Sequence, residues 1–376
     1  MRIVFVTTKF DFETGGGSSP ELDLKIRAMK ELGNEVSAVT TFSQNNRGPQ
    51  PTSYPIFNEF IGTSGQLAIS RGVYKILKKY QARADVFQVD GVVFLFGAGL
   101  YRFLGGAASV LAHFNRELLW FPEKRSRTSR SFQGWLRFLL EKTFGVFLAN
   151  HLDAFTFTTP FLKTAYNNFG LAEEKSAVVR DFIDSGSFPK TTRERAKSGV
   201  ITMLCSGRMV WEKGFDIVLR AFGALLDKKR FRLILSGDGP ERKNLEKLAT
   251  ELGVSEFVSF PGWVSNEKFL DFLRSADIVI LPPWRPDMNS MLLLEAMALG
   301  IPSLVPAQSA LAWSAGEGAM TFKDLDHEDL AEKIERFAAD PELRETLSAK
   351  ALQRIEELYY KKPAAELNAI MRKLCR

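Results

Sequence analysis

Short apolar runs alternate along the chain with longer segments in which apolar residues recur every three or four positions. The first run is Ile3–Thr7, and Leu22, Ile26 and Met29 then recur at helical spacing until Gly33. A buried strand followed by an amphipathic helix, repeated in series, predicts a parallel sheet with crossover helices. Further elements expected in this half are strands at Val36–Thr40, Val86–Val89, Val110–His113 and Ala154–Thr158 and a helix from Pro160 to Gly170.

The alternation stops at a polar segment and then restarts. Phe188–Gly199 reads FPKTTRERAKSG, has no apolar periodicity and is interpreted as a linker region. The strands expected beyond it are Ile201–Cys205, Leu233–Leu235, Val258–Phe260 and Ile278–Leu281. The helices expected there are Phe215–Leu226, Pro240–Gly253, Met291–Leu299 and helical sequence from about Asp329 to Cys375. The pattern predicts an α/β fold of two similar parallel-sheet domains in series, at residues 1–186 and 187–358, with a C-terminal helix at 359–376.

Composition narrows the class of protein. The chain has 376 residues, 45% of them hydrophobic and 25% charged, which is an ordinary globular balance. No apolar run reaches the roughly 18–20 residues that span a bilayer. The N-terminal sequence MRIVFVTTKF has the character of a first buried strand and not of a signal peptide. Two cysteines, Cys205 and Cys375, form neither a disulfide framework nor a zinc site, so we expect a cytoplasmic protein.

The net charge of +6 is unevenly distributed. The stretch 116–142 holds seven basic residues (Arg116, Lys124, Arg125, Arg127, Arg130, Arg137 and Lys142) against three acidic ones. Aromatic residues are interleaved with them: Phe114, Trp120, Phe121, Phe132, Trp135 and Phe138. This pattern fits contact with an anionic membrane, a site for an acidic or diphosphate-bearing acceptor, or a helix with core aromatic residues and a solvated basic face. We expect no nucleic-acid partner.

A glycine cluster, Gly15–Gly17, follows the first expected strand and precedes the first helix. Glycines there let backbone N–H groups approach a phosphate or a sugar at a helix N-terminus, although a plain surface loop has the same composition. The cluster is not GxGxxG, and no acidic residue ends the second strand, so NAD binding is disfavoured.

A second motif directly follows the strand at Ile201–Cys205. Its sequence, GRMVWEKG at 207–214, places two cations, Arg208 and Lys213, at the carboxyl end of a parallel strand. Open α/β sheets bind ligands at this edge, and two fixed positive charges there stabilise a departing diphosphate without a metal. A solvated turn with charges of both signs is the alternative interpretation.

A third motif pairs two carboxylates, Asp287 and Glu295, eight residues apart. Asp287 precedes the expected helix, whereas Glu295 lies inside it among apolar residues. A lone carboxylate in such a helix is costly unless it has a partner or a ligand, and a ribose diol is the simplest ligand. A partly exposed helix face is the alternative.

The order and spacing of these segments resemble glycosyltransferase family 4, retaining enzymes of the GT-B fold, in which two Rossmann-like domains face a central cleft. The resemblance implies that the C-terminal helix at 359–376 packs back on the first domain. The resemblance is carried between Ile201 and about Leu347 by GRMVWEKGFDIVLRAF, LILSGDGPERKNLEKLATELGV, FVSFPGWVSNEKFLDFLRSADIVILPP, DMNSMLLLEAMALGIPSLV and DHEDLAEKIERFAADPELR. The first domain matches less closely, through its glycine-containing N-terminus, VLAH and VVRDFIDSGSF.

The resemblance implies a role for each matching residue. Arg208 and Lys213 would hold the donor diphosphate, Glu295 the ribose, and Asp287 and His113 the transferred sugar. The further donor-binding positions that it implies are Gly16, Gly17, Gly207, Val264, Asn289, Ser290, Met291 and Leu292. Departures from the family pattern gather beside the sugar, where Asp287 replaces the usual glutamate, and they put the identity of the sugar in doubt.

The implied function is retaining, metal-independent transfer of a sugar from a nucleoside diphosphate sugar to a hydroxyl of a glycan or lipid-linked acceptor, in cell-envelope polysaccharide or lipid-linked glycan synthesis. No cofactor or metal is expected, and the expected location is the cytoplasm, with peripheral contact to the inner face of a membrane. The D-x-D sequence at Asp324 and Asp326 is interpreted as helix capping and not as a metal site. A nucleotide-sugar epimerase of the same fold and a non-catalytic partner subunit are the alternative functions.

Overall fold

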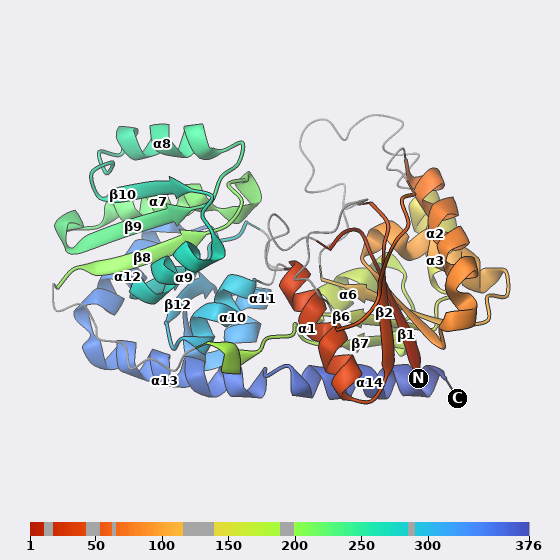
Figure 1. Ribbon diagram of the computed structural model, residues 1–376. Helices are drawn as coiled ribbons and strands as arrows, with labels where there is room; N and C mark the ends of the chain where they lie inside the picture. The colour runs from red at the N-terminus through yellow and green to blue at the C-terminus, as the bar shows by residue number, and fades with distance from the viewer. Residues whose placement is uncertain are drawn as a thin grey trace. The chain divides into compact units, whose positions relative to one another are not determined.

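The computed structural model describes residues 1–10, 18–42, 53–61, 65–115, 139–188, 199–284 and 290–375. The chain forms two compact units, Met1–Ile183 together with Leu358–Arg376, and Asp184–Glu357 (Figure 1). These limits lie within three residues of the expected 186 and 358. Both units are α/β with a parallel sheet, which confirms the predicted fold class.

The sheet of the first unit has seven parallel strands in the order β3-β2-β1-β4-β5-β6-β7. Their bounds are β1 (Arg2–Thr7), β2 (Glu35–Thr40), β3 (Ile56–Asn58), β4 (Val86–Asp90), β5 (Ser109–Phe114), β6 (Ala154–Phe157) and β7 (Ser176–Val178). The strand order reverses between β1 and β4. Open α/β sheets bind ligands at such a switch point, outside the carboxyl ends of the strands.

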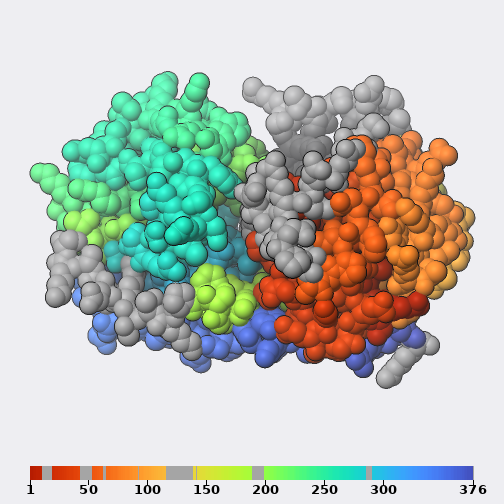
Figure 2. All heavy atoms as spheres, viewed as in Figure 1, coloured from red at the N-terminus to blue at the C-terminus, as the bar shows by residue number. Residues whose placement is uncertain are grey.

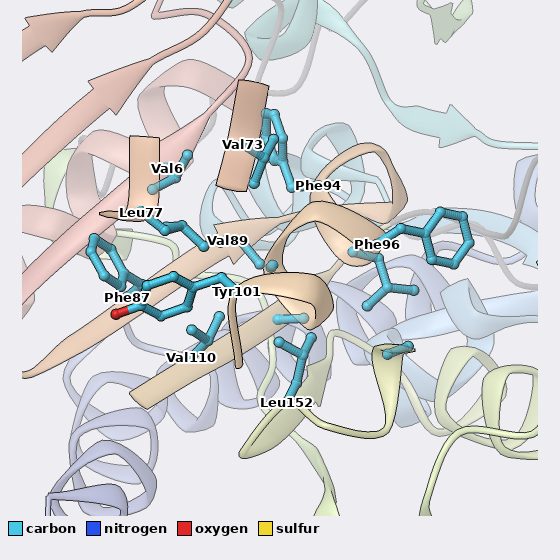
Figure 3. Packing of buried hydrophobic residues seen from close by; sticks show 14 of the residues in the cluster. Val6, Val73, Leu77, Phe87, Val89, Phe94, Phe96, Tyr101, Val110 and Leu152 are labelled. Carbon is cyan, nitrogen blue, oxygen red and sulfur yellow. The ribbon is translucent and has the colours of Figure 1, made fainter. Parts of the chain in front are cut away.

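Both faces of this sheet are buried, which explains why its strands are almost wholly apolar. Along β1, Val4 and Val6 face one core and Ile3 and Phe5 face the other. Figure 3 shows the first core, where Val6 lies among side chains from α2 and α3. The helices and short turns of this unit are α1 (Ser18–Glu31), α2 (Gln66–Tyr80), η1 (Gln81–Arg83), α3 (Val92–Phe103), η4 (Glu141–Gly145), α5 (Val146–Ala149), α6 (Pro160–Phe169), η5 (Glu173–Lys175) and α14 (Lys361–Leu374).

The last helix, α14, packs against α1 although the two are at opposite ends of the chain, and their surfaces meet in Figure 2. The Asn34 side chain donates to Asn368 Oδ1 at 3.0 Å, and the Tyr360 hydroxyl donates to Glu31 at 3.0 Å. The C-terminal residues therefore belong to the first unit, in the position predicted for them.

The second unit has a six-stranded parallel sheet in the order β10-β9-β8-β11-β12-β13, with its own switch point between β8 and β11. The strands are β8 (Ile201–Ser206), β9 (Phe231–Ser236), β10 (Val258–Gly262), β11 (Ile278–Ile280), β12 (Ser303–Pro306) and β13 (Ala319–Phe322). Its helices are α7 (Phe215–Ala224), α8 (Arg242–Glu251), α9 (Asn266–Ser275), α10 (Met291–Ala298), α11 (Ala310–Ala315), α12 (His327–Ala339) and α13 (Pro341–Glu357). Its short turns are η6 (Ser185–Ser187), η7 (Trp211–Lys213), η8 (Lys228–Arg230) and η9 (Gly316–Gly318).

One predicted helix start is wrong. Pro240 was expected in the first turn of a helix, but α8 begins at Arg242 and Pro240 lies in the preceding turn. The reason is that the amide of Glu241 donates to Met209 O at 3.0 Å, so this turn is hydrogen-bonded to the segment after β8. The helix therefore begins only after that contact.

Candidate functional site

A small pocket lies at the switch point of the second sheet. The end of β8 provides Cys205 and Ser206, and β11 with the residues after it provides the opposite wall from Ile280 to Pro283. Lys213, Phe215, Ser290 and Leu311 complete the lining. The cavity volume is about 30 Å³, so the pocket forms the floor of a binding site and not a complete enclosure for a sugar nucleotide.

The segment 207–214 is fixed by backbone contacts to the neighbouring strand ends. The amide of Gly207 donates to Ser236 O at 3.0 Å, and the amide of Met209 donates to Asp238 O at 2.8 Å. Gly237 has a φ of +126°, and a Cβ there would lie 1.9 Å from Gly207 O. The loop after β8 is thus held tightly against the loop after β9, as a preorganised site requires.

The two predicted cations both lie in this segment. Lys213 is half-buried and lines the pocket, and its Cε lies beside Gly207, 4.0 Å from where a Cβ would stand. Arg208 is exposed. Cys205, on the pocket wall, is a neutral thiol at physiological pH because burial raises its pKa to about 12. Positive charge, and not a thiolate nucleophile, characterises this pocket.

The N-terminus of α10 reaches the pocket through Ser290. Because the first amides of a helix lack intrahelical acceptors, Met291 and Leu292 present N–H groups at this positive helix end. Little more than one turn along, Glu295 is half-buried in an otherwise apolar helix. Burial raises its pKa to about 7, and within residues 290–375 and the other described ranges its carboxylate has no hydrogen-bond or ion partner. Such a carboxylate is poised to accept hydrogen bonds from a ligand.

Several predicted positions fall outside the described residues: Gly16, Gly17, Asp287, Asn289 and six of the seven basic residues of 116–142. Val264 is described and lies half-buried just beyond β10, at the carboxyl edge of the same sheet. Of the two D-x-D residues, Asp326 caps a helix as expected, since its Oδ1 accepts from the amides of Glu328 and Asp329 at the start of α12. Asp324 Oδ1 instead accepts from the amide of Gln308 at 3.1 Å.

The first unit holds a row of polar side chains across three adjacent strands. Asp90 of β4 is in register with His113 of β5, which is in register with Thr156 of β6. Side chains alternate between the two faces of a strand, and these three share the face on which Val86, Leu111 and Ala154 pack with α1 and α14. We call Asp90, His113 and Thr156 the polar row. It lies at the carboxyl ends of the strands, and Asp90 adjoins the switch point between β1 and β4.

His113 lies in the middle of the polar row and is only 2% exposed. Its Nε2 is 3.1 Å from Lys25 Nζ, and its Nδ1 is 3.0 Å from Thr156 Oγ1. Burial, together with the nearby Lys25 charge, holds the pKa of His113 well below its usual range, so the ring is neutral. His113 was predicted to contact the donor sugar, but both of its ring nitrogens are engaged within the protein.

Sequence reasoning missed three members of this cluster, Lys25, Glu21 and Asp90. Burial raises the pKa of Asp90 to about 6, against the lowering effects of Lys25 and of a hydrogen bond from Gln88. A signal was present, because the strands VFQVD, VLAHF and AFTF each carry a polar residue near their carboxyl end. Reading the three strands side by side would have indicated a polar site there.

One residue of the aromatic series around 116–142 has a structural role. Phe114 is fully buried in the core of the first unit, where its ring stacks on Phe157 with centroids 5.0 Å apart. Of the aromatic residues named with the basic stretch, Phe114 is therefore a core residue, because it ends β5 on its core-facing side. Among the described residues, no helix is long and apolar enough to cross a bilayer.

Most of the second unit matches a known family of proteins. Residues 189–354 match the family model described as glycosyl transferases, group 1. The lipopolysaccharide core biosynthesis glycosyltransferase LpsE of Rhizobium meliloti is 30% identical over 200 residues, which cover 52% of this chain and 57% of that protein. A D-inositol 3-phosphate glycosyltransferase of Streptomyces griseus is 32% identical over 160 residues, 39% of this chain and 34% of that protein. The chain thus spans about half, or less, of the length of these relatives.

Solved structures match over nearly the whole chain. HepE of Anabaena, in complex with UDP and glucose, has a TM-score of 0.76 at 18% identity, with 98% of each chain covered. Sucrose-phosphate synthase of Thermosynechococcus elongatus has a TM-score of 0.80 at 17% identity, covering 100% of this chain and 99% of that one. At these identities the likeness establishes the fold, which is that of GT-B enzymes. The family match and the named relatives support a transferase.

Proposed function

We propose that the chain is a retaining, metal-independent glycosyltransferase that uses a nucleoside diphosphate sugar as donor. The observation that carries this proposal is the pocket at the β8–β11 switch point. Lys213 and the N-terminus of α10, through Ser290, both line this one pocket. This pocket lies inside the segment that matches group 1 glycosyl transferases. HepE, whose fold the chain shares, is described in complex with UDP and glucose, which supports a donor of the same class.

In the proposed reaction the bond between the anomeric carbon and the distal phosphate oxygen breaks. The acceptor hydroxyl bonds to the same face of that carbon and its proton passes to a phosphate oxygen. Negative charge therefore develops on the departing diphosphate. Arg208, Lys213 and the first amides of α10 are the groups that would stabilise this charge, and Glu295 would accept hydrogen bonds from the ribose. Asp287 is assigned to the transferred sugar.

The exposed apolar residues of the first unit support a membrane-associated acceptor. Phe103, at the end of α3, is 49% exposed, and Phe144 and Phe147 are 61% and 50% exposed. The ring centroids of Phe103 and Phe147 are 5.7 Å apart and those of Phe144 and Phe147 are 6.4 Å apart. Leu104, Leu139 and Leu140 are also exposed.

We call these six residues the apolar surface. Its segment 139–147 overlaps the C-terminal end of the basic stretch 116–142, and basic charge beside aromatic rings complements an anionic bilayer. A lipid-linked acceptor and contact with the cytoplasmic face of a membrane are therefore part of the proposal.

The donor is tested by thermal unfolding in the presence of a panel of nucleoside diphosphate sugars and of the free nucleoside diphosphates. We expect one nucleotide class to raise the melting temperature, and the matching sugar nucleotide to be consumed when an acceptor extract is added. Consumption should persist in excess EDTA. Restoration of a lost activity specifically by manganese or magnesium would contradict metal independence, and conversion of the donor alone into an epimer would favour the epimerase.

A further inference from the structure

Lys25 is a charged side chain buried in the first unit. It projects from α1 with 1% exposure toward the face of the sheet that carries the polar row. Its Nζ lies 3.0 Å from Glu21 Oε1, 3.1 Å from His113 Nε2 and 5.2 Å from the centre of the Phe182 ring. A lysine is almost never buried to this extent unless it is paired, and here an anion, a ring nitrogen and an aromatic face surround it.

The chemistry of these groups determines where the proton of His113 lies. An ammonium group has three donors and no acceptor, so His113 Nε2 must be the acceptor in its contact with Lys25. In a neutral imidazole the other nitrogen then carries the hydrogen, and Nδ1 donates it to Thr156 Oγ1. Protonation of Nε2 would place two donors against each other at 3.1 Å.

We propose that Lys25 is a positioning residue that holds His113 in a single neutral tautomer, with its hydrogen on Nδ1 and its Nε2 occupied. The proton position follows from the two contacts alone. Any consequence for sugar transfer rests on the proposed function and on the role beside the transferred sugar that the family resemblance implies for His113. His113 then acts as a fixed, uncharged group next to the ammonium of Lys25, and it does not exchange protons with the substrate.

The charges around Lys25 favour its ionised form. Burial lowers the pKa of Lys25, but Glu21 on the same helix and Asp90 at the end of β4 outweigh this effect, with a further contribution from Asp181 beyond β7. The net pKa is raised, so the ammonium persists through the physiological range. Of these charged groups, Lys25 is the one that contacts the His113 ring.

The tautomer is tested directly by nitrogen NMR of protein labelled at histidine. The chain has three histidines, His113, His151 and His327, so the His113 signals are assigned by their loss in His113→Gln. In the wild type we expect one pattern, with a protonated Nδ1 and an accepting Nε2, that does not titrate between pH 5 and pH 8. An imidazole in water titrates in this window, with a pKa of about 6.5.

The informative variant is Lys25→Met combined with Glu21→Gln, because Lys25→Met alone leaves a buried carboxylate without its cation. In the double variant we expect His113 to lose the single tautomer and to show a higher pKa, since one donor and one repelling charge are gone. The signals of His151 and His327 should not move. If the His113 pattern is unchanged in a folded double variant, the proposal is wrong.

A matched control lies two residues further along the same helix. Arg27 pairs with Asp23 at 2.8 Å, also four residues apart, but its side chain is 45% exposed. Arg27→Met combined with Asp23→Asn removes an ion pair from α1 without touching the polar row, and it should leave the His113 signals as in the wild type. A change equal to that in the Lys25 variant would show that loss of any α1 ion pair disturbs the ring.

Kinetics separate this inference from the proposed function. With an active donor, the Lys25 double variant should lower kcat more than it raises KM, and its rate should acquire a new ionisation below neutral pH that the Arg27 control lacks. If the wild type turns over no sugar nucleotide, the proposed function fails, whereas the NMR result still decides the role of Lys25.

Discussion

Gly214 lies so close to the carbonyl of Pro282 that only glycine, which has no Cβ, fits at position 214. Gly214 has a φ of +68°, and a Cβ added to it would lie 1.9 Å from Pro282 O. Gly214 follows Lys213 at the start of α7, and Pro282 follows β11 on the pocket wall. The contact therefore joins the segments that follow β8 and β11, the two strands that flank the switch point, and it holds the residue after Lys213 against the opposite wall.

We predict that Gly214→Ala destabilises the second unit and weakens nucleotide binding. A left-handed φ alone costs a non-glycine residue about 1–2 kcal/mol, and relief of the overlap adds about 1–3 kcal/mol. Gly253→Ala is the matched control, because Gly253 has a φ of +66° and nothing within 4 Å of its would-be Cβ. Thermal unfolding should show a clearly larger drop for Gly214→Ala. Equal drops would mean that the Pro282 contact relaxes without cost.

The sequence predicted the site residues of the second unit better than the polar cluster of the first. In the second unit, an apolar run followed by GRMVWEKG already placed Arg208 and Lys213 at the carboxyl end of a strand, because motif and strand are contiguous. In the first unit the essential contact joins Lys25 and His113, 88 residues apart. Lys25 lies beside Leu22 and Ile26 on the helix and resembles a solvated neighbour of the apolar stripe. Only the packing of α1 on the sheet shows that it is buried.

Helices α2 and α3 of the first unit were not predicted. Helix α2 was missed although its buried residues Ile69, Val73, Ile76 and Leu77 recur at helical spacing. Helix α3 was not predicted, because its sequence VVFLFGAGLYRF is apolar on almost every side and has little period to detect. Its glycines allow close packing, since a Cβ at Gly97 would lie 2.4 Å from Ser70 O of α2, and one at Gly99 would lie 2.3 Å from Leu148 O. Such fully buried helices are specified by their neighbours and not by their own pattern.

The cation pair gives a second prediction. Replacing Lys213 or Arg208 by alanine should lower turnover by about 10²–10³, the scale for loss of one preorganised charge-stabilising group. Secondary structure should be unchanged. Arg220→Ala removes an exposed cation from α7 of the same unit and serves as the control. Near-normal turnover in both site variants would remove these residues from the diphosphate site, and equal loss in the Arg220 control would indicate a non-specific effect of net charge.

Glu295 gives a prediction about pH and stability. Burial raises its folded-state pKa to about 7. At pH 4 the carboxyl group is neutral and does not lower the free energy of unfolding. As the pH rises through 7 the buried group ionises, and the protein loses stability. Glu295→Gln should therefore be more stable than the wild type at pH 8, with the difference narrowing toward pH 5. The same variant should bind nucleoside diphosphate more weakly, because the amide cannot accept from both ribose hydroxyls as a carboxylate does.

The measurement is a series of melting temperatures from pH 5 to pH 8.5, with and without nucleoside diphosphate. Glu241→Gln, at a half-exposed position ahead of α8, should track the wild type throughout and is the control. A wild type that is more stable than Glu295→Gln at pH 8 without ligand would show that the carboxylate has a partner in the free protein.

Membrane contact is tested on the apolar surface and on the basic stretch separately. Liposome flotation with neutral and with anionic vesicles, at low and at high salt, should show binding that requires anionic lipid and fades as salt screens the charges. Replacing Phe144 and Phe147 by serine removes two exposed rings and should reduce flotation at every salt concentration. Replacing Lys124, Arg125 and Arg127 by glutamine should reduce it mainly at low salt.

The two sets of variants separate the electrostatic from the apolar contribution to membrane binding. Lysine and arginine contribute about 1 kcal/mol each near an anionic surface, and salt weakens that contribution but not the insertion of rings. Leu67→Ser is the control for the aromatic change, since Leu67 is 89% exposed but lies on α2, apart from the apolar surface. It should float as the wild type does. If the wild type fails to float on anionic vesicles at low salt, the apolar surface does not bind membranes, and the acceptor must reach the enzyme from solution.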